Sequence, residues 1–545
     1  MTSTITLRQI YLLLLVVAAA SVTGRLLSAN RVVEPYLTRD EANPRDPRGP
    51  WPKARPLPSP MFSSNDVSRW ATIRALVDEG TYVIGQRTWL DPEHKTYKDT
   101  GITFEPGWGG VDKVMDPDTG KFYSSKPTLF PTLLAVEYWL LKNLFGWTLT
   151  THLYTVVRVM LFTVNVIPLF FYWLVLARLV DRFGTTDWGK LFVFAAACFG
   201  TFLTTFATSL NNHTIAACTA LYALYFGLNV WSSAGPLAGF AWKNCFLAGT
   251  FAALTAAVEL PALSFLVGLF ALLLWKAPRV ALIGFAPPVA LVVAAGLLTN
   301  YLAIGKLTPA YAEFGGKSTW YTYEGSHWKP DPSKPRRGID FAANHEGRAE
   351  YVFHFLLGHH GVFSLSPIWL LSAAGMVVTL RQFLRLRHSR ATEPPHATES
   401  PPATEPPASE AVNPEAIVES GLVPPASPPP PEEQPKPPDS STERDRWLVA
   451  GLTAYLTVVV VGFYLVISNN YGGNTSGPRW LFWLTPFWLL TMLPVADWLS
   501  ARRWGRFLAL AMLAVSVASV TFPAWNPWRQ PWIYHWLDSQ GLIPY

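Results

Sequence analysis

The chain contains 545 residues, of which 50% are hydrophobic and only 15% are charged, and its formal net charge is +6. Soluble domains carry about 25% charged residues, so this composition excludes an ordinary soluble protein and predicts an all-α, polytopic transmembrane protein. The excess positive charge falls mainly in short segments between apolar stretches, which argues against nucleic-acid binding. The three cysteines show neither CxxC nor Cys/His metal spacing, so no disulfide framework or structural zinc site is indicated.

The first apolar stretch, 10–27, is interpreted as a retained membrane helix rather than a cleaved signal peptide. The polar segment that follows, 28–151, predicts a large first outer loop with a proline-rich, extended start. Within it, 67–79 has apolar residues at helical spacing. The stretch 128–147 is apolar but contains a proline and two charged residues. It is short for a bilayer crossing, so we expect an interfacial helix there.

Ten further apolar stretches approach the ~20 residues that cross a bilayer, which gives about eleven spans in total. The fifth of these ten is short and begins at a proline. The ten stretches are 152–179, 191–210, 214–231, 244–260, 261–275, 280–303, 361–380, 447–468, 479–497 and 506–523.

The spans divide the chain into three parts. Residues 1–380 form a membrane core with outer loops at 28–151 and 305–350, and residues 447–545 form C-terminal helices with an outer tail. Between them, 388–446 is predicted to be a disordered cytoplasmic linker, because its tract 391–441 holds 16 prolines and few bulky residues.

Basic clusters and polar motifs alternate along the chain, so the predicted spans place them on opposite faces of the membrane. Positive residues mark the cytoplasmic side, which predicts an extracytoplasmic site in the inner or plasma membrane of a cell. The basic clusters are 178–190, 242–243, 276–279, 381–390 and 502–506, and the polar motifs are 64–69, 126–127, 211–213, 259, 358–360 and 472–479.

Several polar side chains on the outer face are candidates for a site. Asp66, next to Asn65, stands before an amphipathic stretch, where it either caps a helix, worth about 1 kcal/mol, or acts in catalysis. Arg479 follows a glycine-rich loop and opens a span, so it either contacts lipid headgroups or binds an anion. Glu259 stands beside Leu-Pro at a predicted helix corner. An acid near the membrane costs free energy, so its presence there suggests a function.

Three histidines and an aromatic loop complete the candidates. His213 is either a loop residue bonded to backbone or part of the site, and His359 and His360 precede an apolar span. Adjacent histidines of a helix point to different sides, so this pair alone does not predict a two-histidine metal site. With Glu259, His213 and Asp66, however, they suggest a divalent cation as a candidate cofactor. The aromatic residues of 305–348 either line a sugar-binding cleft or form an interfacial cluster.

Two stretches of the first outer loop follow a family pattern. Asn-Asp-Val-Ser-Arg-Trp (65–70) with Gly-Thr-Tyr (80–82) is similar to an acidic motif that opens a helix ending in Gly-x-Tyr. Ser-Lys-Pro-Thr-Leu (125–129) is similar to a Lys-Pro-Pro-Leu motif at the start of an interfacial helix. Over residues 10–260 the chain thus resembles the GT-C class of integral membrane glycosyltransferases, particularly the protein O-mannosyltransferase and lipid A aminoarabinose transferase group. It departs from that pattern in carrying Asn for the first acid and Thr for the second proline.

The resemblance implies an enzyme that moves a sugar from a polyprenyl-phosphate donor to a hydroxyl or amine of a lipid, glycan or protein acceptor. It implies Asp66 as the catalytic base, and Lys126 and Arg158 as ligands of the donor phosphate. Arg479 lies outside the stretch that resembles the family, and it is a candidate for the same role because its planar fork binds phosphate oxygens. Two alternatives stay open, namely a transporter or flippase of a lipid-linked substrate and a GT-C-like scaffold without activity. The sequence shows neither midplane charges nor an internal repeat, which a transporter would favour.

Overall fold

The computed structural model describes residues 6–32, 57–91, 93–94, 96–232, 240–313, 319–330, 338–392, 440–468 and 470–543. Within these residues, eight helical stretches are long and apolar enough to cross a membrane, so the protein is an all-α polytopic membrane protein with only a small sheet. They are α1 (Leu7–Ser28), α4–η3–α5 (Leu153–Phe183), α6–α7 (Asp187–Phe206), α8 (Asn212–Trp231), α11–η5–α12 (Pro278–Ile304), α16 (Ser440–Ile467), η8–α17 (Arg479–Ser500) and α18 (Arg503–Thr521).

Helices also occupy the other three predicted spans. These are α9 (Phe240–Val258), α10 (Leu263–Lys276) and α15 (Ile368–Thr392). With the preceding turn η4 (Leu260–Ala262), α10 forms a shorter apolar helix, as its sequence predicts. Glu259 adopts extended backbone angles at the N-cap of η4, which places the predicted corner between α9 and α10.

Several spans are built from two or three pieces. The bounds of the pieces are α4 (Leu153–Leu161), η3 (Phe162–Val166), α5 (Ile167–Phe183), α6 (Asp187–Phe199), α7 (Leu203–Phe206), α11 (Pro278–Val280), η5 (Ala281–Phe285), α12 (Ala286–Ile304), η8 (Arg479–Leu484) and α17 (Thr485–Ser500). The predicted span 361–380 likewise divides into α14 (Val362–Leu365) and α15. Pro367 separates them, because proline cannot donate a helical hydrogen bond.

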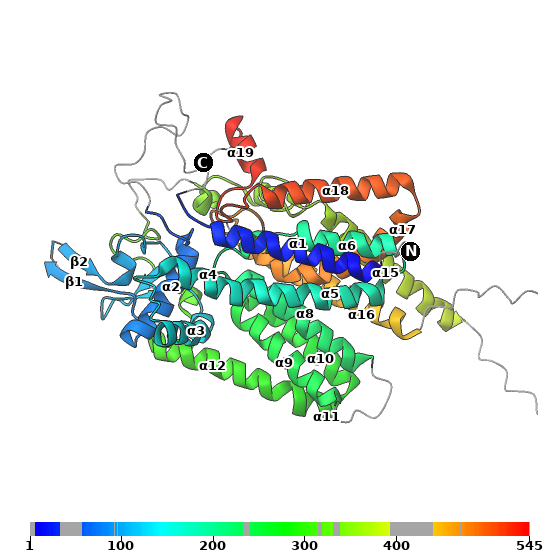
Figure 1. Cartoon of the computed structure of the whole chain (residues 1–545), viewed down its shortest axis with the longest axis horizontal. Coiled ribbons are helices and arrows are strands. Elements are labelled where there is room, and N and C mark those ends of the chain that lie inside the picture. Colours follow the sequence, from blue (N-terminus) through cyan, green and yellow to red (C-terminus); the bar gives the residue numbers. More distant parts are fainter. Residues whose placement is uncertain are drawn as a thin grey trace, which may run out of the picture.

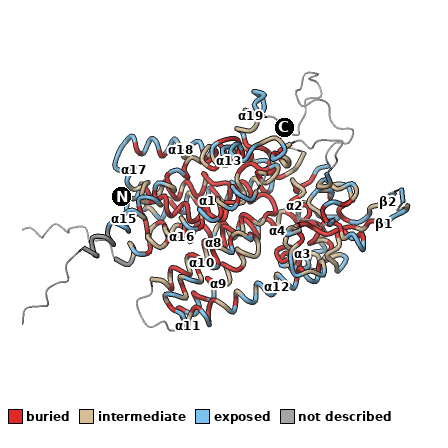
Figure 2. The backbone as a smooth tube through the Cα atoms, turned by 180° about the vertical axis from the view of Figure 1, so that it is seen from behind, coloured by how far each residue is buried: buried red, intermediate tan, exposed pale blue. Residues whose placement is uncertain are grey.

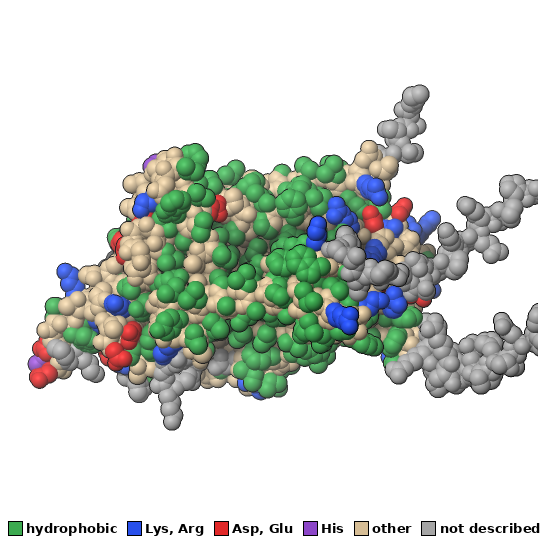
Figure 3. Space-filling view, turned by 90° about the horizontal axis from the view of Figure 1, so that it is seen from below, with side chains coloured by type: hydrophobic (Ala, Val, Ile, Leu, Met, Phe, Trp, Pro, Cys, Tyr) green, Lys and Arg blue, Asp and Glu red, His purple; other side chains and the backbone are tan. Residues whose placement is uncertain are grey.

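The long helices lie side by side as one bundle (Figure 1). Buried residues concentrate on α8 and α17, as the red segments of Figure 2 show. By contrast, α1, α12 and α18 keep many apolar side chains exposed, such as Leu13, Leu291 and Phe507. Hydrophobic side chains cover much of the middle of the bundle on the face seen in Figure 3. Exposed apolar surface of this extent is what a bilayer covers.

A small sheet lies at one end of the bundle (Figure 1). It comprises β1 (Gly85–Asp91), β2 (Thr96–Thr100), β3 (Lys113–Met115) and β4 (Lys121–Ser124), in the antiparallel order β2-β1-β4-β3. No strand is predicted from the sequence in this part of the first outer loop. Gly101 adopts a φ of 98° and approaches the backbone of Gly85 so closely that a Cβ there would lie 2.7 Å from the Gly85 Cα atom.

Short helices pack beside the sheet. They are α2 (Ser64–Arg74), which continues into the π-helical turn η1 (Ala75–Glu79), η2 (Ile102–Phe104) and α3 (Leu129–Phe145). α2 thus begins three residues earlier than predicted. The helix α3 covers the stretch expected to be interfacial and is not among the eight long apolar helices. The remaining elements are η6 (Ala310–Glu313), η7 (Ile339–Asn344), α13 (Arg348–Leu356) and α19 (Trp532–Ser539).

Lys and Arg side chains gather most densely at the end of the bundle opposite the sheet (Figure 3). This end carries the junctions between α5 and α6 and between α17 and α18, where the basic clusters of the sequence lie. The predicted disordered tract falls on 393–439, which lies outside the described residues. Its two ends are helical, because α15 continues to Thr392 and α16 begins at Ser440. Residues 33–56 of the proline-rich start also lie outside the described residues.

Candidate functional site

A cavity of about 490 Å³ opens at the sheet end of the bundle. Segments far apart in the sequence form its walls, namely the start of α2, the loops before β3 and α3, the 311–340 region and the loop before η8. The lining residues are Phe62, Ser63, Ser64, Asn65, Val111, Asp112, Ser125, Lys126, Tyr311, Tyr321, Trp328, Asp340, Asn470, Gly472, Gly473, Asn474, Arg479, Trp480 and Trp528. Three residues predicted from the sequence, Asn65, Lys126 and Arg479, therefore share one cavity.

A carboxylate and an ammonium group form an ion pair in the wall of this cavity. The Nζ atom of Lys126 lies 2.6 Å from Oδ1 of Asp112, and the Ser64 hydroxyl donates to Oδ2 of Asp112 at 2.6 Å. Burial acts to raise the pKa of Asp112, but the charge and hydrogen bond of Lys126 outweigh it, so this pKa lies below its usual value. Burial lowers the pKa of Lys126 despite the opposing charge of Asp112. Asp112 is therefore an ionised carboxylate facing the cavity.

Arg479 is held at the edge of the cavity by three contacts. Its guanidinium donates to the carbonyl of Gly472 at 2.9 Å and lies 3.1 Å from Nε2 of His213, and its Cζ atom lies 4.7 Å from the ring centre of Trp528. Gly472 has a φ of 93°, and a Cβ atom there would come within 3.0 Å of Nε of Arg479. Glycine thus allows the loop backbone to close around the guanidinium.

A buried polar network supports Arg479 from behind. His213 pairs through Nδ1 with Glu259, and Asn212 donates to Oε1 of the same carboxylate at 2.6 Å. Arg69 donates to Oδ1 of Asn212 at 2.6 Å and to the carbonyl of Asn65 at 2.8 Å. Since buried charges must be paired, this network of hydrogen bonds and ion pairs fixes the orientation of Arg479. The structure therefore links His213 and Glu259 to the cavity through Arg479.

Asp66 lies next to the cavity but does not line it. Ser63 is the N-cap of α2, and Asp66 completes a capping box. Its two carboxylate oxygens accept the backbone N–H groups of Phe62 at 3.1 Å and Ser63 at 3.2 Å. Burial raises the pKa of Asp66 from 3.8 to about 7 against these hydrogen bonds. Asp66 therefore helps to cap α2, but the N-cap residue is Ser63 rather than Asp66 as considered from the sequence, and the predicted catalytic role stays a prediction.

Aromatic side chains form a second part of the cavity wall. Three come from the loop that the sequence marked as aromatic, namely Tyr311, Tyr321 and Trp328, and three more are Phe62, Trp480 and Trp528. Other aromatic residues of that loop pack on the sheet instead, since Trp320 stacks on Tyr123 and Tyr323 contacts Phe122. The same loop thus supplies both a cavity wall and a small hydrophobic core.

An apolar groove of about 380 Å³ shares a wall residue with the cavity. Tyr311 lines both, and the other groove residues come from the η4 corner and from α16. They are Leu260, Pro261, Val459, Val460, Phe463 and Tyr464. Exposed Leu260 and Phe463 place the groove at the apolar surface of the bundle.

Besides Asp66, His213 and Glu259, three further predicted site residues lie outside the cavity wall. Arg158 sits on α4, where its guanidinium lies 4.9 Å from the ring centre of Tyr154. His359 and His360 are buried between α13 and α14, with their Nδ1 atoms 2.5 Å apart. The divalent-cation group suggested from the sequence, which combined these histidines with Glu259, His213 and Asp66, is therefore divided. His213 and Glu259 belong to the Arg479 network, whereas His359 pairs with Glu346, as its Nε2 atom lies 3.6 Å from Oε1.

Several residues that form the site do not stand out in the sequence. Asp112 and Asp340 are the two acids in the cavity wall, and Arg69 and Asn212 are links of the buried network. The helical spacing of Arg69 after Asn65 and the doubled asparagine before His213 were available signals. Asp112 lies among other acids of a loop without periodicity, and nothing in the sequence distinguishes it.

Comparisons with known proteins find similarity only at the level of remote structure. No protein-family model and no curated protein matches the chain. The apo form of the Archaeoglobus fulgidus oligosaccharyltransferase aligns with 97% of this chain and 57% of its own, at 11% identity and a TM-score of 0.43. The same enzyme in complex with Zn and sulfate aligns with 96% of this chain and 54% of its own, at 12% identity and a TM-score of 0.42. The chain thus spans little more than half the length of these proteins, and a likeness at this level does not assign a family.

Proposed function

We propose that this protein is a glycosyltransferase that moves a sugar from a polyprenyl-phosphate donor to an acceptor on the extracytoplasmic face of the membrane. One observation carries the proposal, namely that two carboxylates, two cations and six aromatic side chains line one cavity beside an apolar groove. The resemblance of 65–70 and 125–129 to GT-C motifs supports it independently, because both stretches contribute to this cavity.

Lys126 and Arg479 are proposed to bind the donor phosphate. The charge of Arg479 is one of the causes that lower the pKa of Lys126, so the two cations act on the same space. The phosphate gains negative charge as the sugar leaves, and pre-placed cations stabilise that charge. Arg479 offers a planar fork for two phosphate oxygens, while Lys126 offers a point charge.

Asp112 is proposed as the general base in place of Asp66, because it is the carboxylate that faces the cavity beside Lys126. Asp112 takes the proton of the acceptor hydroxyl, the acceptor oxygen forms a bond to the anomeric carbon, and the bond from that carbon to the phosphate oxygen breaks with inversion. The electron pair of the broken bond stays on the polyprenyl phosphate. When the phosphate attracts Lys126, the Asp112 carboxylate loses part of its counter-charge and becomes a stronger base. Asp66 then acts by holding the start of α2 in place.

The apolar groove supports a lipid carrier for the sugar. Its lining is aliphatic and aromatic, and it meets the polar cavity at Tyr311. A donor with a phosphate in the cavity and isoprene units in the groove would bury both of its parts. Lys and Arg side chains gather at the opposite end of the bundle, and positive residues are typical of the cytoplasmic side. This supports the proposal that the cavity lies at the outer headgroup level of a cell inner or plasma membrane.

The aromatic wall supports a carbohydrate at the reacting centre. Tyr311, Tyr321 and Trp328 can stack on the apolar faces of a sugar ring, and the polar residues of the same wall supply hydrogen bonds. The acceptor is a hydroxyl or amine of a lipid, glycan or protein. A mannosyl-type sugar is the first donor to test, in line with the O-mannosyltransferase resemblance.

A turnover assay with labelled polyprenyl-phosphate sugar and the purified protein in lipid vesicles tests this proposal. We expect transfer of label to acceptor, lost in Asp112→Asn and retained in Asp118→Asn, an exposed acid of the same loop. Donor movement across the vesicle membrane without bond cleavage would instead support the flippase alternative. Donor binding with neither movement nor transfer would support a scaffold.

A further inference from the structure

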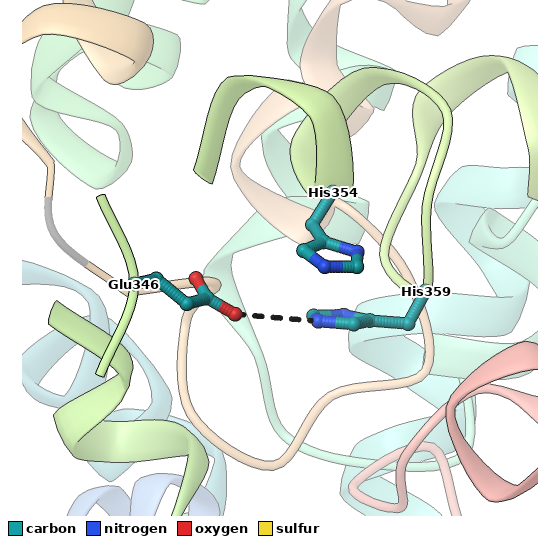
Figure 4. Close-up of side chains that lie close together, drawn as sticks. All are labelled: Glu346, His354 and His359. Carbon is teal, nitrogen blue, oxygen red and sulfur yellow. Dashed lines mark ion pairs between the residues drawn. The ribbon is translucent and has the colours of Figure 1, made fainter. Parts of the chain in front are cut away.

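A second cluster of chemistry-bearing side chains lies beside the cavity. It consists of Glu346, which follows η7, His354 on α13 and His359 in the turn before α14. One carboxylate oxygen and one ring nitrogen of each histidine all lie within 4.8 Å of one another. Figure 4 shows the two imidazole rings one above the other with the carboxylate beside them, and the ring centres are 4.0 Å apart.

Two side chains of the cluster are buried, His354 is half-buried, and further side chains hold the outer atoms of the cluster. The side chains of His359 and Glu346 are each 1% exposed. The hydroxyl of Tyr471 donates to Oε2 of Glu346 at 2.5 Å, which leaves Oε1 on the side of His359. The Nδ1 atom of His359 lies 2.5 Å from Nδ1 of His360, so its Nε2 atom faces Glu346. Metal-binding histidines and carboxylates characteristically have such second partners, which fix tautomer and orientation.

We propose that Glu346, His354 and His359 form a binding site for one divalent transition-metal cation, with Zn²⁺ as the expected ion. Imidazole nitrogens together with one carboxylate suit zinc, whereas Mg²⁺ and Ca²⁺ prefer all-oxygen sites. Zn²⁺ holds these ligands at about 2.0–2.2 Å. In a tetrahedral site two such ligand atoms lie about 3.3–3.6 Å apart, so the widest separation in the cluster, which is at most 4.8 Å, shortens by no more than about 1.5 Å on binding. Three protein ligands leave a fourth position for water.

The site connects two segments that line the cavity. Glu346 is six residues from the cavity residue Asp340, and Tyr471 directly precedes Gly472, whose carbonyl accepts from Arg479. A bound cation fixes the carboxylate of Glu346, which accepts the hydrogen bond of the Tyr471 hydroxyl. We therefore expect metal binding to rigidify the loop that positions Arg479. This role goes beyond the proposed sugar transfer and does not depend on it.

Metal binding is measured on the full chain, purified in detergent without a polyhistidine tag and stripped with a chelator. We expect a single equivalent of Zn²⁺ per chain to remain after gel filtration, by elemental analysis, and no retained Mg²⁺. Co²⁺ in place of Zn²⁺ should give the visible ligand-field absorption of a low-coordinate site. Zn²⁺ should also raise the melting temperature, since a ligand of the folded state stabilises it.

Glu346→Gln is the sharpest variant, because glutamine keeps the shape and can still accept from Tyr471, yet it is a poor zinc ligand. It should lose the bound Zn²⁺ and the Co²⁺ absorption, as should His359→Ala. Tyr471→Phe should weaken Zn²⁺ binding about 10–100-fold. His94→Ala is the matched control, since His94 also contacts a carboxylate, Asp91, but in an exposed pair. A wild-type chain that retains no Zn²⁺, or a folded Glu346→Gln chain that retains as much as wild type, overturns the proposal. Neither outcome depends on sugar transfer.

Discussion

Replacing Asp112 by asparagine removes the charge of this side chain while nearly preserving its shape. The amide oxygen can still accept from Ser64, whose hydroxyl lies 2.6 Å from Oδ2 in the wild type. The variant cannot take a proton from an acceptor and no longer neutralises Lys126, 2.6 Å away. The change therefore separates general-base catalysis from donor binding.

The expected effect on kcat and on the donor KM follows from the loss of the base and the loss of the negative charge beside Lys126. Removing a general base slows turnover about 10²–10⁴-fold, which corresponds to about 3–5 kcal/mol of transition-state stabilisation at 1.36 kcal/mol per tenfold. Lys126, released from its carboxylate, becomes more available to the donor phosphate. Asp112→Asn should therefore lower kcat by this factor while the donor KM stays equal or falls.

The pH profile separates Asp112 from Asp66 as the base. A base works only when deprotonated, so kcat/KM falls as the pH drops through its pKa in the free enzyme. The pKa of Asp112 lies below its ordinary range because of Lys126, which predicts constant kcat/KM down to about pH 5. Burial raises the pKa of Asp66 to about 7, so a profile that declines from near neutral pH would identify Asp66 instead.

The assay is initial-rate transfer from labelled polyprenyl-phosphate sugar in vesicles, with Asp118→Asn as the control. A well-folded Asp112→Asn protein with wild-type kcat would refute the reasoning. An increase in the donor KM at unchanged kcat would also refute it, because it would make Asp112 a binding residue only.

Three further predictions concern neighbouring parts of the site. Arg479→Lys should raise the donor KM and lower kcat together in the same assay, because lysine keeps the charge but loses the planar fork; equal kinetics would exclude bidentate phosphate binding. Asp66 binds a proton in the folded state that the unfolded chain releases, so its contribution to stability falls as the pH rises from about 4 to about 7. Asp66→Asn should remove this slope from melting temperatures recorded across that range, and parallel wild-type and variant curves would contradict the burial argument. Phe463→Glu should raise the KM of a long-chain donor more than that of a short-chain one, whereas Val458→Glu, a lipid-exposed change on the same helix, should not discriminate between them.

Much of the membrane architecture follows from the sequence alone. Burial in hydrocarbon requires long apolar runs, and a run is a local property that can be counted without knowing its neighbours. All eleven predicted spans coincide with helices for this reason, including the short one that begins beside Pro261. Side-chain chemistry likewise marked Lys126, His213, Glu259 and Arg479 as polar groups that need partners near a membrane.

The tertiary structure alone decided which of these groups meet, and in what role. The sheet of 85–124 depends on pairings between strands that carry little periodicity, so no local sequence pattern predicts it. Asp66 and Asp112 are both acids of the same outer loop. In the folded protein both carboxylate oxygens of Asp66 accept hydrogen bonds at the start of α2, whereas Asp112 pairs with Lys126. His359 similarly lies with His354 and Glu346 rather than with His213. Apolar runs are specified residue by residue, whereas a site is specified by distances between segments, and those distances exist only once the helices have packed.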